Sequence, residues 1–148
     1  MVLILNLLAN KWDHDMFGFG LGKHKRTLTF AFADCFAPLK DELGNVPIPM
    51  QTDPAINAAI LGACEGYAKA HNIKPADITM VADAVCEELD RRESIEVQNR
   101  VDGWKSENNA AFSEAYQDAK SRTDGDLNLS WLTDYASERF EPATGKML

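Results

Sequence analysis

The sequence predicts an α+β fold, in which a small N-terminal antiparallel β-sheet of two or three strands precedes a mainly α-helical part of about four helices. Two strand-like stretches lie before residue 36, and long helix-like stretches follow them in one block. Strands and helices grouped in this way are not typical of a parallel α/β sheet. We expect a single domain with a β-rich segment at 1–35, a connector at 36–53, a helical part at 54–141 and a frayed tail at 142–148.

The β-rich segment is predicted from two patterns. Val2–Leu8 is a continuous apolar run, typical of a buried strand, and Thr27–Ala33 alternates large apolar side chains with smaller ones. Between them, Phe17–Gly22 alternates large apolar residues with glycines, which weaken a strand unless a ligand or backbone comes close. The basic cluster Lys23–Arg26 follows. Glycines beside basic residues can hold a phosphate, but the sequence has no phosphate-loop motif here, so we expect a hairpin turn.

Metal sites are the next chemistry to consider. Asp13-His14-Asp15 is the one place in the sequence where histidine and carboxylates cluster, and a full site would need further ligands from elsewhere. A calcium loop counted from Asp124 has Leu129 where glycine is needed and Tyr135 where glutamate is needed. We therefore expect no metal and no cofactor.

The helical part begins with clear signals. Asp53 can cap a helix with proline at its first position, and Pro54–His71 carries a ridge of large residues beside a seam of small ones. A seam of small residues lets another helix approach closely. The short connection Asn72–Lys74 predicts an antiparallel hairpin with a helix that begins at Pro75. Two further helices are expected, one from Ser106 to about residue 120 and a short one that Ser130 caps. The connector is expected to hold at most a short helical turn around Leu39–Leu43.

The stretch Pro75–Trp104 changes its apolar face halfway. The later apolar residues, Val97, Val101 and Trp104, form a stripe rotated by roughly 100° from the first. Either the helix breaks near Arg92–Ser94, or one long helix leaves its first partner and meets another, as a projecting arm that makes a dimer contact. We favour the break and keep the homodimer as the alternative.

Charge is distributed unevenly along the chain. The net charge is −8, and residues 51–148 carry eighteen acidic side chains against ten basic ones, whereas residues 1–50 carry five of each. Direct binding to nucleic acid or anionic lipid is disfavoured, because it depends on lysine and arginine. Asp83, Glu87 and Asp90 lie on one outward face, for which solvation is the default interpretation and partner binding the alternative.

The cysteines bear on the cellular compartment. Cys35, Cys64 and Cys86 are odd in number and far apart, which predicts buried thiols in a reducing compartment. The apolar run at residues 1–9 is too short to span a bilayer and has no basic residue before it. We expect a cytoplasmic protein without a membrane segment.

Three classes of function fit this sequence. The first is a non-enzymatic protein-interaction module, an inhibitor or adaptor, whose charge could imitate that of nucleic acid. The second is a small enzyme or ligand-binding protein that uses a loop at residues 12–26. The third is a structural subunit of a homo-oligomer. We favour the first, with a protein partner, and expect no enzymatic activity. Its candidate partner-binding residues are Asp83, Glu87, Asp90, Val97, Val101 and Trp104.

Overall fold

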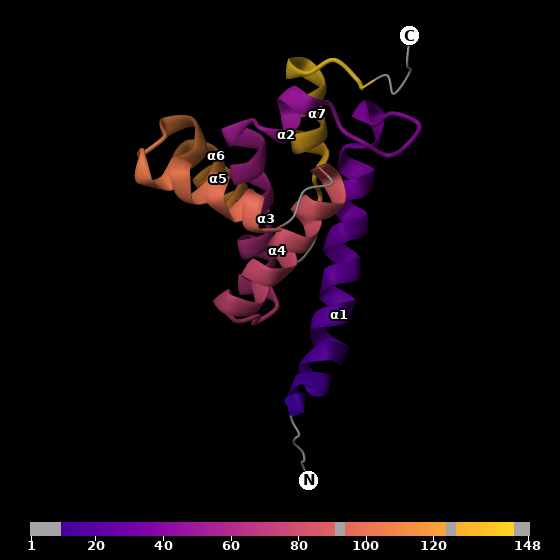
Figure 1. Ribbon diagram of the computed structural model, residues 1–148, viewed down its shortest axis with the longest axis vertical. Helices are drawn as coiled ribbons and strands as arrows, with labels where there is room; N and C mark the ends of the chain where they lie inside the picture. Colours follow the sequence, from indigo (N-terminus) through magenta and orange to yellow (C-terminus); the bar gives the residue numbers. More distant parts are fainter. Residues whose placement is uncertain (1–9, 91–93, 124–126, 144–148) are drawn as a thin grey trace.

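The computed structural model describes residues 10–90, 94–123 and 127–143, and of residues 10–20 the backbone alone. Within these ranges the chain is helical and contains no strand (Figure 1). The predicted α+β fold, with its N-terminal sheet, is therefore wrong. The elements are α1 (Asn10–Cys35), the 3-10 turn η1 (Ala37–Leu39), α2 (Ile48–Gln51), α3 (Pro54–Ala70), α4 (Pro75–Asp90), α5 (Ser94–Ser106), α6 (Ala110–Arg122) and α7 (Ser130–Arg139).

Helix α1 replaces the expected sheet. Both Thr27–Ala33 and Phe17–Gly22 lie within it, while Val2–Leu8 falls outside the described residues. The physical reason is that Leu28, Phe32 and Phe36 recur every four residues and are all fully buried. The helix buries this stripe against its neighbours and satisfies its own backbone hydrogen bonds, whereas a strand at Thr27–Ala33 would need a partner strand for them.

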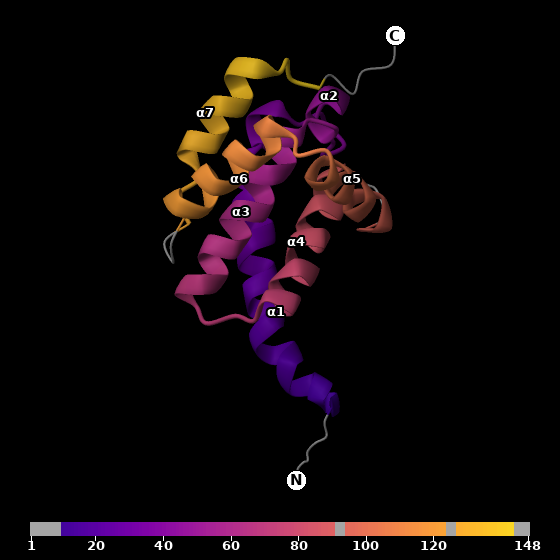
Figure 2. The same cartoon turned by 90° about the vertical axis from the view of Figure 1, so that its left-hand side faces the viewer.

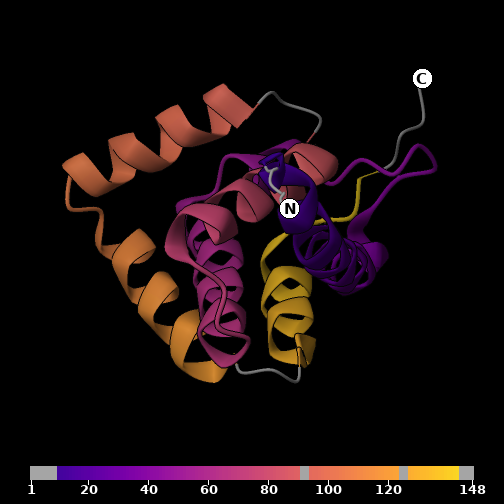
Figure 3. The same ribbon diagram turned by 90° about the horizontal axis from the view of Figure 1, so that it is seen from below.

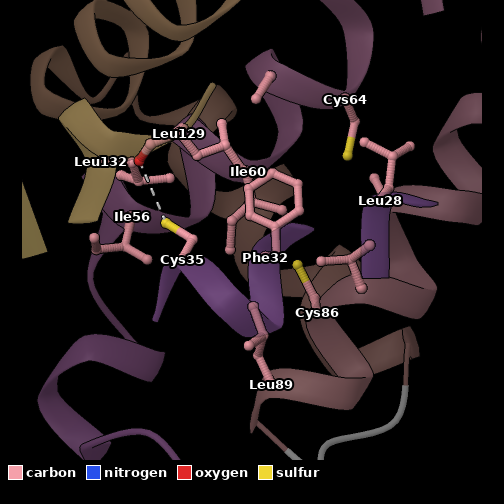
Figure 4. Close-up of a cluster of buried hydrophobic side chains, with 14 of the residues drawn as sticks. Leu28, Phe32, Cys35, Ile56, Ile60, Cys64, Cys86, Leu89, Leu129 and Leu132 are labelled. Carbon is pink, nitrogen blue, oxygen red and sulfur yellow. Dashed lines mark hydrogen bonds between the residues drawn. The ribbon is translucent and has the colours of Figure 1, made fainter. Parts of the chain in front are cut away.

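The core forms around this stripe. Figure 4 shows the ring of Phe32 among Ile60 of α3 and Cys86 and Leu89 of α4. On the other side of α1, the Cys35 thiol donates to the carbonyl oxygen of Leu129 at 3.7 Å. The hydroxyl of Thr133 donates to the Cys35 carbonyl at 2.8 Å, which satisfies an acceptor at the C-terminal end of α1.

The predicted start of α3 is confirmed. The Asp53 carboxylate accepts a hydrogen bond from the backbone N–H of Ile56 at 2.9 Å, and Pro54 occupies the first turn. The predicted close approach on its small-residue seam is also confirmed, with α6 as the partner (Figure 2). A Cβ added to Gly66 would lie 2.5 Å from the carbonyl oxygen of Thr123, and one added to Gly62 would overlap the carbonyl oxygen of Tyr116.

The antiparallel hairpin of α3 and α4 is confirmed. Asn72 adopts a left-handed φ of 57°, and the N–H of Ile73 returns to the Ala68 carbonyl at 2.9 Å, which ends α3. Cys64 and Cys86, one on each helix, both lie in the core. The pattern that predicted these helices is one of large apolar residues at helical spacing.

Two helices stand in place of one continuous helix over 75–104. Helix α4 ends at Asp90 and α5 begins at Ser94, and α5 runs in another direction (Figure 3). Val101 packs against the core, and the Trp104 ring packs on Phe112 of α6 with centroids 5.9 Å apart. The alternative of one long helix that projects as an arm is wrong, because α4 and α5 are separate helices and both Val101 and Trp104 pack within the same chain.

The smaller elements differ in their caps from the predictions. Ser106 is the last residue of α5, and α6 is capped instead by Asn109, whose side chain accepts from the N–H of Phe112 at 2.9 Å. Ser130 begins α7 without capping it; the side chain of Asn128 accepts from the Ser130 N–H at 3.1 Å. The helical turn expected around Leu39–Leu43 is displaced, because η1 spans Ala37–Leu39 and shares only Leu39 with that range. Asp124, the start of the rejected calcium loop, lies outside the described residues.

The α3–α6 contact predicts opposite effects for two helical glycines. Gly62→Ala should destabilise the fold by about 1–3 kcal/mol, because the added methyl group overlaps the backbone of α6. Gly103→Ala in α5 is the matched control, since its methyl group would meet nothing within 4 Å and should stabilise by about 0.5–1 kcal/mol. Urea unfolding measures both free energies. Equal effects of the two substitutions would contradict the close helix approach.

Thiol reactivity provides a second check. Burial raises the pKa of Cys35 to about 11 and that of Cys64 above its usual range. Because thiolates are the reactive form and all three cysteines are buried and outside any disulfide, no thiol should react promptly with a disulfide reagent at pH 8. All three should react in guanidinium chloride. A thiol that titrates at once in the folded protein would show that the packing around it is wrong.

Candidate functional site

A surface groove lies between α1 and α4, which pack side by side (Figure 1). It consists of two neighbouring hollows of about 630 Å³ and 550 Å³. Gly22 and Lys25 of α1 and Ala84 and Glu87 of α4 line both hollows, so the two are continuous. The small side chains of Gly22 and Ala84 leave room at the centre, where larger residues would fill the groove.

Two large apolar side chains are exposed at this groove. Phe30 of α1 lines the larger hollow and is 73 % exposed, and Met80 of α4 lines the smaller one and is 60 % exposed. An isolated exposed apolar residue is ordinary, but two on facing helices of one groove form an apolar pair of anchors for a partner. We name the surface that these lining residues form the α1–α4 groove: Gly22, Lys25, Arg26, Thr29 and Phe30 of α1 with Met80, Asp83, Ala84, Glu87 and Glu88 of α4.

Charges of opposite sign face each other across the α1–α4 groove. Lys25 and Arg26 lie on the α1 side, and Glu87 and Glu88 lie on the α4 side. Asp83 lines the smaller hollow with Gln98 of α5. The acidic face is therefore matched by basic residues of α1, and it is not the purely outward strip that sequence periodicity suggested.

Asp83 has an environment of its own. Burial raises the pKa of its carboxyl group, the hydrogen bond that it accepts from the Gln98 amide lowers it in part, and the charge of Glu87 raises it. A partly buried carboxylate with one amide partner and a like charge nearby is held in an unfavourable ionised state. Asp83 is thus the titratable group of the groove that a partner's cation would stabilise most directly.

The six candidate partner-binding residues are not all brought together. Asp83 and Glu87 line the α1–α4 groove, and Asp83 shares a smaller cavity of about 260 Å³ with Val101, between α3, α4 and α5. Trp104 packs on α6, away from these two. Asp90 and Val97 belong to α4 and α5, but their side chains lie outside what the structure describes. Of the apolar stripe of α5, the two described side chains, Val101 and Trp104, serve packing within the chain.

The expected loop at 12–26 is part of α1. Its residues do not converge, because Arg26 lines the α1–α4 groove whereas His24 turns to α3 and hydrogen-bonds to Tyr67. The side chains of Asp13-His14-Asp15 are outside the described residues. Among the side chains that are described, no three His, Cys, Asp or Glu form a group suited to hold a metal ion.

Sequence periodicity missed Phe30, Met80, Gly22 and Gln98. The predicted strand Thr27–Ala33 places Phe30 on one face with Leu28 and Phe32, and only helical spacing separates it from them. Met80 lies outside the apolar stripe of α4. This position is the one sequence feature that could have indicated an exposed apolar side chain here. The groove itself joins residues fifty or more positions apart, so no local pattern indicates it.

A second cleft, of about 490 Å³, lies where α3, α6 and α7 meet. Its floor includes Ala55 and Ala59. Arg122 lies over the ring of Trp131 at 5.2 Å and Arg139 over the ring of Tyr135 at 4.4 Å. Arg122 also pairs with Asp118 at 2.8 Å, so the cations of this cleft already have partners within the chain.

Comparison of the chain with family models, with curated proteins and with solved structures found no match. In the part of the chain that is described, each helix is too short or too polar to cross a bilayer.

The environment of Asp83 predicts a pH-dependent effect of Asp83→Asn. A carboxyl group whose pKa is raised on folding reduces stability as the pH rises through that pKa, so the ionised group is unfavourable at neutral pH. The variant should therefore melt at a higher temperature than the parent at pH 7, and the difference should shrink as the pH falls below the folded pKa. Thermal unfolding followed by circular dichroism measures it. Glu88→Gln, at an exposed position, should leave the melting temperature unchanged at both pH values.

Proposed function

We propose that this chain is a non-enzymatic protein-interaction module that binds an amphipathic segment of a partner protein in the α1–α4 groove. The observation that carries the proposal is the exposed pair Phe30 and Met80 on the two helices that form the groove. Grooves usually hold amphipathic helices by taking the helix's apolar side chains into hollows of several hundred Å³, where the exposed Phe30 and Met80 would contact them. This mode of binding suits an inhibitor or an adaptor.

The charges of the groove support this proposal and restrict the partner. Lys25 and Arg26 along one wall and Glu87 and Glu88 along the other would orient a segment with acidic residues on one side and basic residues on the other. Charge complementarity of this kind contributes orientation and association rate more than affinity. Direct nucleic-acid binding is disfavoured, because the net charge is −8 and acidic residues line half of the groove.

The location that we propose is the cytoplasm. The support for it is chemical: all three cysteines are buried and none forms a disulfide, as is usual for proteins of reducing compartments. Immunofluorescence or fractionation of the tagged chain in its native cell would test it.

The groove predicts which surface a peptide ligand selects. Peptides should first be selected from a random helical library on the folded chain and then mapped by NMR chemical shifts. We expect the chemical-shift changes to centre on Phe30 and Met80. The double variant Phe30→Ser with Met80→Ser should weaken binding at least about tenfold, because each substitution removes roughly 1.5–3 kcal/mol of apolar burial on binding. The matched control is Ile48→Ser in α2, which removes an equally exposed apolar side chain (68 %) elsewhere.

Two outcomes would contradict this function. If the selected peptides change the chemical shifts of residues in the α3–α6–α7 cleft and not those of the groove, they bind in that cleft. Equal affinity loss for Ile48→Ser and for the double variant would show that the peptides respond to general hydrophobicity. Unfolding free energies of all variants should agree within about 0.5 kcal/mol, because the replaced side chains are exposed.

A further inference from the structure

Two histidines and a tyrosine meet where α1 passes the C-terminal end of α3. The rings of His24 and His71 have centroids 5.3 Å apart, and the ring of Tyr67 lies 5.4 Å from the first and 4.0 Å from the second. His24 comes from the middle of α1, and His71 is the residue that follows α3. Both histidines retain contact with solvent, whereas Tyr67 is buried beneath them. This cluster takes no part in the α1–α4 groove.

In both imidazole rings of the cluster, Nδ1 is the nitrogen that makes the hydrogen bond. Nδ1 of His71 lies 3.0 Å from the backbone carbonyl oxygen of Tyr67, which can only accept, so this nitrogen carries the proton. Nδ1 of His24 lies 2.7 Å from the Tyr67 hydroxyl group. Each ring therefore has Nδ1 engaged by the same residue, and no hydrogen bond to either Nε2 exists among the described residues.

This arrangement is the one that metal-binding histidines show. A histidine ligand holds the metal through one ring nitrogen while the other nitrogen is bonded to a carbonyl, carboxylate or other polar group, which sets the tautomer and the ring orientation. Tyr67 serves both rings in that role, with its carbonyl for His71 and its hydroxyl for His24. The Tyr67 carbonyl fixes the tautomer in which Nε2 of His71 has a lone pair, and the Tyr67 hydroxyl group, which can accept as well as donate, permits the same tautomer in His24.

The ring spacing fits one shared ion. With metal–nitrogen distances of about 2.0–2.1 Å and tetrahedral angles, two imidazoles that bind one ion have centroids about 5 Å apart. The observed separation of His24 and His71 is 5.3 Å. Burial, the neighbouring His71 and Lys23 together lower the pKa of His24, which favours the neutral ring that a metal requires.

We propose that His24 and His71 bind a divalent transition-metal ion of the zinc class through their Nε2 atoms, with water completing the coordination. Imidazole nitrogens suit Zn²⁺, Ni²⁺ and Cu²⁺ rather than Ca²⁺ or Mg²⁺. No third protein ligand is present among the described side chains, so the ion exchanges with solvent. The bound ion links α1 to the end of α3. The cysteines do not compete, because all three are buried.

The test is a Zn²⁺ titration of the tag-free chain, followed by calorimetry and by ¹⁵N NMR of the imidazole nitrogens. In the parent chain, Zn²⁺ should shift the Nε2 resonances of His24 and His71 and leave their Nδ1 protons in place. His24→Gln and His71→Gln should each weaken Zn²⁺ binding at least about tenfold, because each removes one of two ligands. Tyr67→Phe should weaken it by about 10–100-fold, since it removes the hydroxyl group that orients His24.

The third histidine provides the matched control. His14→Gln should bind Zn²⁺ as the parent does and should keep the rise in melting temperature that Zn²⁺ produces. The proposal is overturned if Zn²⁺ shifts neither Nε2 resonance at millimolar concentration, or if His14→Gln abolishes the binding while His24→Gln preserves it. The NMR readout needs no variant, so a substitution that failed to fold would not obscure the result.

Discussion

The packing of one ridge of α1 against the helical hairpin of α3 and α4 is the interaction on which this structure depends. Leu28, Phe32 and Phe36 are fully buried, and full burial of each such side chain contributes roughly 1.5–3 kcal/mol. Phe32 lies at the centre, among side chains of α3 and α4 (Figure 4). This ridge holds α1 beside α4 and brings its C-terminal end to α7, where Thr133 donates to the Cys35 carbonyl. The position of every other surface feature of α1 follows from it.

Both proposed sites are consequences of that placement. When Leu28 and Phe32 face inward, helical geometry turns Phe30 outward by roughly 200° from Leu28, to the edge of the α1–α4 groove. The same geometry turns His24, four residues before Leu28, toward Tyr67 and His71. The tendency of apolar side chains to be buried does not explain an exposed phenylalanine. Exceptions to such a rule are expected at functional positions.

The second constraint is the close contact of α3 with α6. Gly62 and Gly66 bring the two backbones together, and the Tyr116 hydroxyl group donates to the Glu65 carboxylate at the same interface. Burial is the main cause that raises the pKa of Tyr116 to about 12, with the Glu65 hydrogen bond and charge adding to it. Nζ of Lys120 also lies 3.7 Å from the Glu65 carboxylate. The edge of this interface is therefore polar, whereas at Gly62 and Gly66 the two helices pack backbone against backbone. It fixes α6 and, through Trp104 and Phe112, the position of α5.

Where the sequence pattern fits only one kind of secondary structure, the local sequence alone determined the helix. Asp53 and Pro54 start α3 and its small residues predict a close neighbour, while the rotated stripe after Arg92 predicts that α4 and α5 are separate. At α1 two periods coincide: Leu28 and Phe32 belong equally to an alternating strand face and to a helical stripe, and Phe30 alone tells them apart. Only the available partner decides between them, because a helix can bury its stripe on α4, whereas a strand needs another strand for its backbone hydrogen bonds. The groove and the histidine pair join residues more than forty positions apart, so tertiary packing decided both.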